Sequence, residues 1–159
     1  YHYNFSPPDV QKDIFIKQIK IAIEAALPMV IHSREAMSDT LEIMDSFGAH
    51  LPPAVVHCFG GNAEEAKICV DKGYYISFTG VVTFKNAQSA RDAAAAVPAE
   101  RLMVETDYPY MSPAPMRSQK INEPALMAHT AVKLAEIKQM PAERLAAIMT
   151  ANSRRFFRI

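Results

Sequence analysis

The sequence of 159 residues has little cysteine, no tryptophan and no long apolar run. Its two cysteines, Cys58 and Cys69, are too few for the disulfide framework of a small secreted domain, and no Cys-x-x-Cys pair suggests structural zinc. No apolar stretch approaches the roughly 20 residues that a membrane span requires. We therefore expect a cytoplasmic protein that keeps its thiols reduced and has no membrane partner.

An excess of charge of either sign is also lacking. The chain carries 17 basic and 17 acidic side chains, so its formal net charge is zero. This balance argues against a large electrostatic surface for nucleic acid, although a local basic patch stays open. The sequence also has no Gly-x-Ser-x-Gly elbow, no glycine-rich phosphate loop and no dinucleotide fingerprint.

What the sequence does contain is an alternation of short apolar runs and longer amphipathic stretches. Half of its residues are hydrophobic, enough for a sizeable core in a chain of one-domain length. We expect helices over 7–27, 37–47, 62–72, 86–96, 123–138 and 141–156. We expect strands over 29–31, 54–56, 74–79 and 102–104.

Several of these helices have recognisable ends. Ser6 is the predicted N-cap of the first helix, and Asn62 with Glu65 forms a predicted capping box for the third. Gly73 ends that helix, and Asn122 is the predicted cap of the helix that begins at residue 123.

Strands that alternate with helices pair in parallel, because each crossover returns the chain in the same direction. The carboxyl ends of the strands then lie on one edge, where α/β folds place their ligands. The residues expected on this edge are His32, His57, Thr79, Glu105 and Asp107. Four such strands form either a small open sheet or half of a barrel.

The two histidines and Asp107 predict a metal site on this edge. His32 and His57 each follow three apolar residues of neighbouring strands, and Asp107 follows a third such run. Imidazole and carboxylate suit zinc, manganese or iron, and a divalent ion offsets the cost of crowding carboxylates. The alternative is structural: Asp107 caps the following turn, and the histidines bond backbone carbonyls.

Other polar residues near this edge give weaker signals. Arg34, Lys85, Arg117 and Lys120 fall in the rim loops, where each either meets a phosphate or is a solvated surface charge. Cys58 follows His57 directly, but strand alternation directs their side chains to opposite faces. We therefore do not expect a Cys–His nucleophilic pair.

Five segments of the sequence resemble motifs of one known family. The segments VIHSREA, HCFGG, ISFTGVVTFKNA, ERLMVETDYPY and NEP occur in the order and approximate spacing of the TatD family of metal-dependent deoxyribonucleases. The resemblance covers essentially the whole chain. It implies a (β/α)8 barrel of the amidohydrolase type whose carboxyl rim binds divalent metal ions (Mg, Mn or Zn), two in a complete active site.

The resemblance also assigns roles to residues. It implies that His32, His57 and Asp107 are metal ligands, on the strands that correspond to the fifth, sixth and eighth of the barrel. Asp107 and Glu105 become the catalytic residues, with Asp107 acting on the attacking water and Glu105 standing beside the metals. The implied mechanism is cleavage of a phosphodiester bond by metal-activated water, with DNA as the substrate.

Four further residues are the predicted substrate contacts. Arg34 and Lys85 are the rim cations expected to meet phosphates, and Asn122 and Glu123 belong to the Asn-Glu-Pro segment that the family places beside its site.

The family's first and fourth strands carry a His-x-His pair and a bridging glutamate that have no counterpart here. The predicted fold is therefore α/β: the C-terminal half of a TIM-type (β/α)8 barrel, with four β/α units plus terminal helices. Residues 1–159 would form a single partial domain. We expect this chain alone to lack part of the metal site and to have little activity. We also expect it to self-associate or to pair with the missing N-terminal half, because a half barrel exposes strand edges.

Two other functions stay open beside the nuclease. One is an amidohydrolase-type reaction on a substrate other than nucleic acid, such as an amide or a lactone. The other is a non-catalytic fragment or interaction module that keeps the motifs only by descent. Bound-metal content and DNA cleavage separate the three.

Overall fold

A four-stranded parallel sheet forms the centre of the chain, seen here in a computed structural model that describes residues 1–3 and 5–159. The strands stand in the order β1-β2-β3-β4, so each one neighbours the strand that follows it in sequence. Their bounds are β1 (Met29–His32), β2 (Ala54–His57), β3 (Tyr75–Phe78) and β4 (Leu102–Val104). The predicted parallel α/β arrangement is confirmed, and the strands begin and end within one residue of prediction.

Helices connect and flank these strands. The described residues form α1 (Pro8–Glu24), α2 (Met37–Asp45), α3 (Ala63–Asp71), α4 (Gln88–Ala96), α5 (Met127–Ile137) and α6 (Ala142–Phe157). They also form the short 3-10 turns η1 (Gly48–His50), η2 (Gly80–Thr83), η3 (Ala99–Arg101) and η4 (Pro124–Leu126). Within the described part of the chain, no helix combines the length and the apolar character that a membrane crossing needs.

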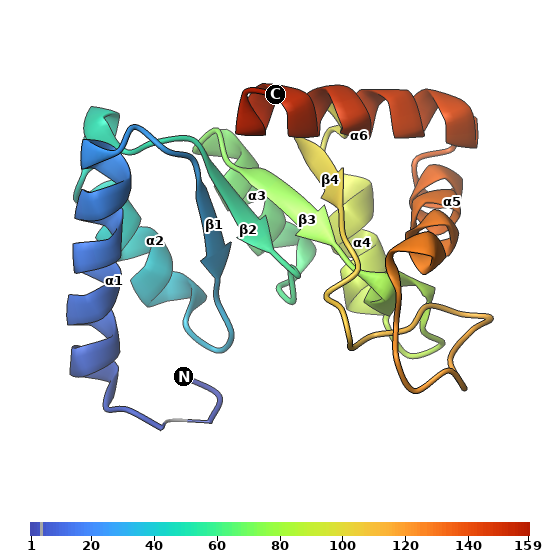
Figure 1. Cartoon of the computed structure of the whole chain (residues 1–159), viewed down its shortest axis with the longest axis horizontal. Coiled ribbons are helices and arrows are strands. Elements are labelled where there is room, and N and C mark those ends of the chain that lie inside the picture. Colours follow the sequence, from blue (N-terminus) through green and yellow to red (C-terminus); the bar gives the residue numbers. More distant parts are fainter. Residues whose placement is uncertain (4) are drawn as a thin grey trace.

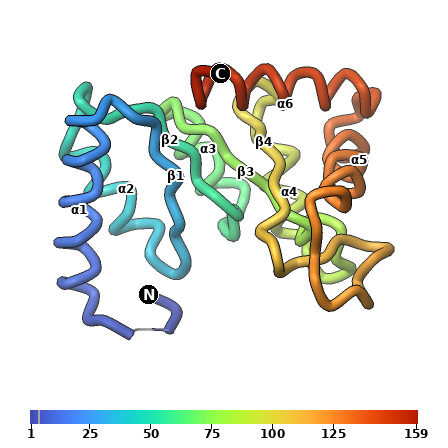
Figure 2. Tube along the Cα trace, in the orientation of Figure 1, coloured from blue at the N-terminus to red at the C-terminus, as the bar shows by residue number. Residues whose placement is uncertain are grey.

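The helices divide the space around the sheet. In Figure 1, α3 and α4 lie behind the sheet, α1 lies beyond β1 and α5 lies beyond β4. Helix α6 lies across the start of β4 and extends toward β3, and the loops at the carboxyl ends gather at the opposite edge (Figure 1). The backbone trace in Figure 2 places the N-terminal segment at this same edge, beside the loop that follows β1. The carboxyl edge is therefore free of α6.

Two of the predicted helix starts need correction. The N-cap of α1 is Pro7 rather than Ser6, and the cap makes no side-chain hydrogen bond because a proline has no group to accept one. The segment from residue 123 begins as the 3-10 turn η4, whose N-cap Glu123 has no capping bond, and the α-helix starts only at Met127. Asn122 is thus not a helix cap.

The predicted start of α3 is confirmed in detail. The Asn62 side chain accepts hydrogen bonds from the N–H groups of Glu64 and Glu65, and the Glu65 carboxylate accepts one from the Asn62 N–H. Gly73 follows the helix with φ +85°, a conformation that costs glycine far less than other residues. This local chemistry is readable from sequence because every partner lies within four residues.

The two faces of the sheet are covered to different extents. One face packs against the helices in a large core that includes Ile76, Phe78 and Leu102. On the other face, Phe156 of α6 covers Tyr75, with ring centroids 5.6 Å apart. Val30 of β1 remains 57% exposed. The second face is therefore covered near the strand starts of β2 to β4 and is more open at β1.

Lys138, at the end of α5, connects that helix to the end of α4. Its ammonium donates to the carbonyl oxygens of Ala95 at 2.8 Å and Val97 at 2.6 Å. Burial lowers the pKa of Lys138, since leaving water disfavours the charged form. This burial is offset because the ammonium supplies hydrogen-bond donors to carbonyl oxygens at the end of α4, which have no partner within the helix.

Replacing this lysine tests the connection. Lys138→Met is expected to lower the free energy of unfolding by about 1–3 kcal/mol, the range for losing charged hydrogen bonds in a partly buried place. Urea unfolding followed by circular dichroism measures the change. The matched control is Lys133→Met, which breaks only the surface pair with Glu136 and should change stability by less than about 0.5 kcal/mol. Equal effects of the two substitutions would contradict the assignment.

Candidate metal centre

The parallel register brings the two histidines side by side. His32 pairs with His57 at the last position of β1 and β2, and their ring centroids are 5.6 Å apart. Strand alternation buries Ile31 against the helices, so the side chain of His32 projects from the other face. The sheet therefore presents two imidazoles next to each other at its carboxyl edge.

Glu105 fixes the orientation of one of these rings. Its Oε2 lies 2.6 Å from Nδ1 of His57, and its Oε1 accepts a 2.7 Å hydrogen bond from the backbone N–H of Cys58. A carboxylate that accepts the Nδ1 proton leaves the Nε2 lone pair of the ring free for a metal. This nitrogen faces Asp107, whose Oδ1 is 3.7 Å away. The arrangement is that of an oriented metal-binding histidine.

The electrostatics of the two imidazoles differ. The hydrogen bond to Glu105 raises the pKa of His57. Burial lowers the pKa of His32, and the neighbouring His57 lowers it further. Burial opposes the ionisation of Glu105, but the hydrogen bonds from His57 and the Cys58 N–H outweigh it and lower the pKa of Glu105. On acidification, His57 is thus the first of the two rings to gain a proton.

This difference can be measured directly. In the metal-free chain, His57 is expected to release its proton at higher pH than His32, and Glu105→Gln should lower the pKa of His57. Because the folded pKa of His57 is raised, its pairing contributes stability fully below the unfolded pKa, and that contribution is lost as pH rises through the folded pKa. NMR titration of the ring protons gives both values. A reversed order of His32 and His57 would contradict the geometry.

Asp107 reaches the edge from an unusual backbone conformation. Its φ is +56°, in the left-handed region where aspartate and asparagine are among the better tolerated residues. The loop around it is held by Asn122, whose amide donates to the carbonyl oxygens of Thr106 at 2.8 Å and Tyr110 at 2.7 Å. Asn122 is 1% exposed. It therefore acts on the site by holding the Asp107 loop, and direct contact with substrate stays a prediction.

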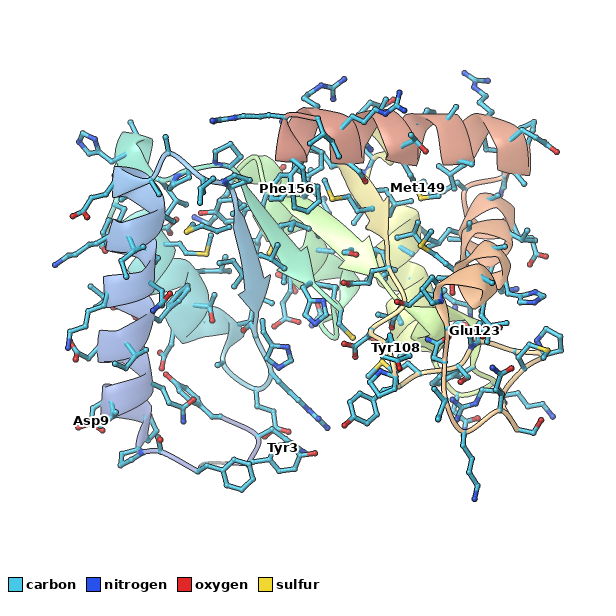
Figure 3. The ribbon with its side chains drawn as sticks, viewed as in Figure 1. Tyr3, Asp9, Tyr108, Glu123, Met149 and Phe156 are labelled. Atoms are coloured by element: carbon cyan, nitrogen blue, oxygen red, sulfur yellow. The ribbon has the colours of Figure 1, made fainter. Side chains whose placement is uncertain are left out.

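The other predicted contacts lie around the edge. Arg34 follows β1 in the adjoining loop and is exposed, as is Lys85 in the loop after η2. Glu123 is also exposed and lies where the loop returns to α5, as Figure 3 shows. These side chains lie near the carboxyl edge, and their contact with substrate stays a prediction.

Cys58 is not placed to act as a nucleophile. Burial raises the pKa of its thiol to about 11, so the group is protonated near neutral pH. Its Sγ lies 3.7 Å from Oγ1 of Thr79 and 3.6 Å from Sδ of Met111. The side chain packs into the loops beneath the site, in agreement with the expectation that it is not part of a Cys–His pair.

The imidazole and carboxylate groups on this edge are suitable ligands for a divalent ion, but they do not form a complete set of ligands. Within residues 1–3 and 5–159, no three His, Cys, Asp or Glu side chains are grouped to hold a metal ion. His57 and Asp107 are a nitrogen and oxygen pair 3.7 Å apart, with His32 beside them. Imidazole and carboxylate are ligands that zinc and manganese accept. The edge therefore fits part of a metal site.

Sequence reasoning missed two links in this site. It placed Glu105 beside the metals, without the bond that orients His57. It assigned Asn122 the roles of helix cap and substrate contact, and it did not predict the hydrogen bonds by which Asn122 holds the Asp107 loop. Neither link has a local signal, because both join residues that are more than ten positions apart in the sequence.

Functional side chains at the carboxyl ends of parallel strands are the arrangement on which α/β proteins build their active sites. The family of TatD-related DNases matches residues 1–158. The chain belongs to this family, as its motifs predicted.

Individual relatives agree with this placement. The chain is 42% identical over 159 residues to YabD of Bacillus subtilis strain 168, which is named an uncharacterized metal-dependent hydrolase; the match covers 100% of this chain and 62% of YabD. It is 34% identical over 163 residues to the 3'-5' ssDNA/RNA exonuclease TatD of Citrobacter rodentium, covering 100% of this chain and 62% of that protein. The chain thus spans about three fifths of the length of these relatives.

A solved structure shows the same arrangement of elements. YJJV, a TatD homologue from Escherichia coli K12, superposes with a TM-score of 0.84 at 29% identity, covering 95% of this chain and 57% of that one. The fold of the described residues is therefore a TatD fold over the part that is compared.

Proposed function

We propose that this chain carries part of the active site of a metal-dependent hydrolase that cleaves phosphodiester bonds in DNA. The observation that carries the proposal is the oriented His57, with Glu105 on Nδ1 and Asp107 on the side of Nε2, next to His32. A metal-binding histidine needs one ring nitrogen held by a hydrogen bond and the other free beside further donors, and His57 has this arrangement.

Each residue has a role in this reaction. His32 and His57 would hold one divalent ion (Mg, Mn or Zn) and Asp107 another. Bound ions of this kind lower the pKa of a water molecule to near neutral and stabilise charge on the phosphate. Asp107 would accept the proton of the attacking water, and Glu105 keeps His57 in the tautomer that binds metal. Arg34 and Lys85 are the cations proposed to contact phosphate oxygens.

DNA is favoured over other substrates by the relatives. The Citrobacter rodentium protein is named for cleavage of single-stranded DNA and RNA, and the family is named for DNase activity. The zero net charge of this chain limits long-range attraction to DNA, so binding must depend on contacts near the site.

We also propose that residues 1–159 are the second half of a (β/α)8 barrel, a single partial domain. The incompletely covered second face of the sheet, the edge strands β1 and β4, and the three-fifths coverage of the relatives support this proposal. An N-terminal segment of relatives, about a hundred residues long or four β/α units, would complete both the barrel and the metal site. Without it, we expect the chain to self-associate through its open edges.

The test compares this chain with an extended chain, in which the upstream segment of YabD is fused before Tyr1. With Mn²⁺ and end-labelled DNA, the extended chain is expected to cleave at least about 100-fold faster, since the shorter one lacks metal ligands. Robust cleavage by residues 1–159 alone would contradict the incomplete site. Cleavage by neither chain, despite metal bound to the extended one, would refute the nuclease; amide and lactone substrates would then be assayed.

A further inference from the structure

Four exposed aromatic rings lie on segments that adjoin the candidate metal centre. Tyr3 and Phe5 are 67% and 90% exposed, and Tyr108 and Tyr110 are 63% and 69% exposed. Tyr108 follows Asp107 directly, while Tyr3 lies against the loop that follows His32. Figure 3 shows Tyr3 and Tyr108 at the same edge of the molecule, although they lie far apart in the sequence.

The segment that carries Tyr3 and Phe5 is held by hydrogen bonds of the two residues that precede Tyr3. The hydroxyl of Tyr1 donates to Asp39 at 2.6 Å, and Nδ1 of His2 lies 2.6 Å from a Glu35 oxygen. These two side chains bind the segment to α2 and to the loop after β1. Tyr3 and Phe5 then stack on each other in the open, with ring centroids 5.3 Å apart and planes 12° from parallel. The segment that carries the stack is thus tied down by hydrogen bonds of Tyr1 and His2.

A cation accompanies this stack. The Arg34 guanidinium lies 5.7 Å from the centre of the Tyr3 ring, and Arg34 is two residues from His32. The backbone that carries Tyr108 and Tyr110 is held in a different way, because Asn122 donates to the carbonyl oxygens of Thr106 and Tyr110. Both pairs are therefore presented by segments tied to the site.

We propose that Tyr3 with Phe5, and Tyr108 with Tyr110, form two stacking platforms for the unpaired bases of a single-stranded nucleic acid. Arg34 supplies a contact to the backbone phosphate between a stacked base and the metal centre. Exposed rings beside a cation are how proteins bind single strands without reading sequence, since every base has a π-face and a duplex hides it. This inference rests on the proposed function and deepens it: it names the residues that would hold the bases of a single strand, the kind of substrate for which the Citrobacter rodentium relative is named.

Binding without metal tests the inference apart from catalysis. The chain is titrated, in EDTA and low salt, against three labelled probes of equal length: a single strand of about ten nucleotides, its abasic counterpart and a duplex. The variants are Tyr3→Ala/Phe5→Ala and Tyr108→Ala/Tyr110→Ala. Phe157→Ala, an exposed ring of α6 at the far end of the strands, is the matched control.

Each double variant is expected to bind the base-containing single strand about tenfold more weakly, with unchanged binding of the abasic probe. The Tyr3→Phe and Tyr108→Phe variants should keep the wild-type affinity, because stacking needs the ring and not the hydroxyl. The chain has no tryptophan, so quenching of tyrosine emission reports the stacking directly, and it should be reduced in both double variants.

Equal losses for the normal and abasic strands, tighter binding of the duplex, or no binding by the wild-type chain would each overturn the proposal. The nuclease proposal is judged separately, by cleavage in the extended chain. If the extended chain stacks bases but does not cleave DNA, the stacking proposal is supported and the nuclease proposal is refuted. If it cleaves DNA but does not stack bases, the nuclease proposal is supported and the stacking proposal is refuted.

Discussion

Asp107→Asn is expected to lower metal-dependent DNA cleavage by the extended chain about a thousandfold or more. The substitution removes the negative charge that faces Nε2 of His57 and the proposed acceptor for the proton of the attacking water. It leaves the backbone undisturbed, because asparagine tolerates the left-handed φ of +56° as well as aspartate does. The loss should therefore appear in the chemistry and in metal affinity, with no change in the fold.

The measurement combines cleavage rates with calorimetric titration of Mn²⁺, and circular dichroism checks the fold. Asp45→Asn is the matched control, because Asp45 pairs with Lys72 at the far end of α2 and should leave cleavage within about twofold of wild type. If Asp107→Asn kept more than about a tenth of the activity, Asp107 would be neither the proton acceptor nor an essential ligand. His57 and His32 would then have to account for the metal by themselves.

The histidines on the carboxyl edge show what a sequence can predict about a site. His32 and His57 end apolar runs of equal length, so the strand ends were visible, and parallel pairing then placed the rings in the same register. The alternation of strands and helices predicted their parallel pairing in the same way, whereas the strand order itself came from the structure. These inferences need only local patterns and the geometry of the crossovers.

The contacts that organise the site could not be predicted in this way. The bond between Glu105 and His57 spans β2 to β4, and its existence depends on the height of both side chains above the sheet. The wrong cap at Ser6 has another cause: a serine before two prolines fits the usual pattern, yet the helix starts one residue later. The Glu105–His57 bond thus depends on tertiary geometry, whereas the position of the α1 cap depends on the neighbouring Pro7.

Asn122→Ala is the second substitution with a large expected effect. It is expected to lower the free energy of unfolding by about 2–4 kcal/mol, because two partly buried carbonyl oxygens lose their donor and the buried Asn122 side chain leaves a small cavity. It should also weaken Mn²⁺ binding by the extended chain about tenfold, since the carbonyls of Thr106 and Tyr110 flank the Asp107 loop. Urea unfolding and calorimetric titration measure the two effects.

Asn152 provides an unusually close control. Its amide also joins two carbonyl oxygens, those of Ala99 and Leu102 at 2.8 Å each, and it is equally buried at the opposite end of β4. Asn152→Ala should therefore destabilise the chain by a similar amount while leaving Mn²⁺ affinity unchanged in the folded protein. If both variants weakened metal binding equally, the loss would reflect general loosening of β4. A loss confined to Asn122→Ala would show that this amide positions Asp107.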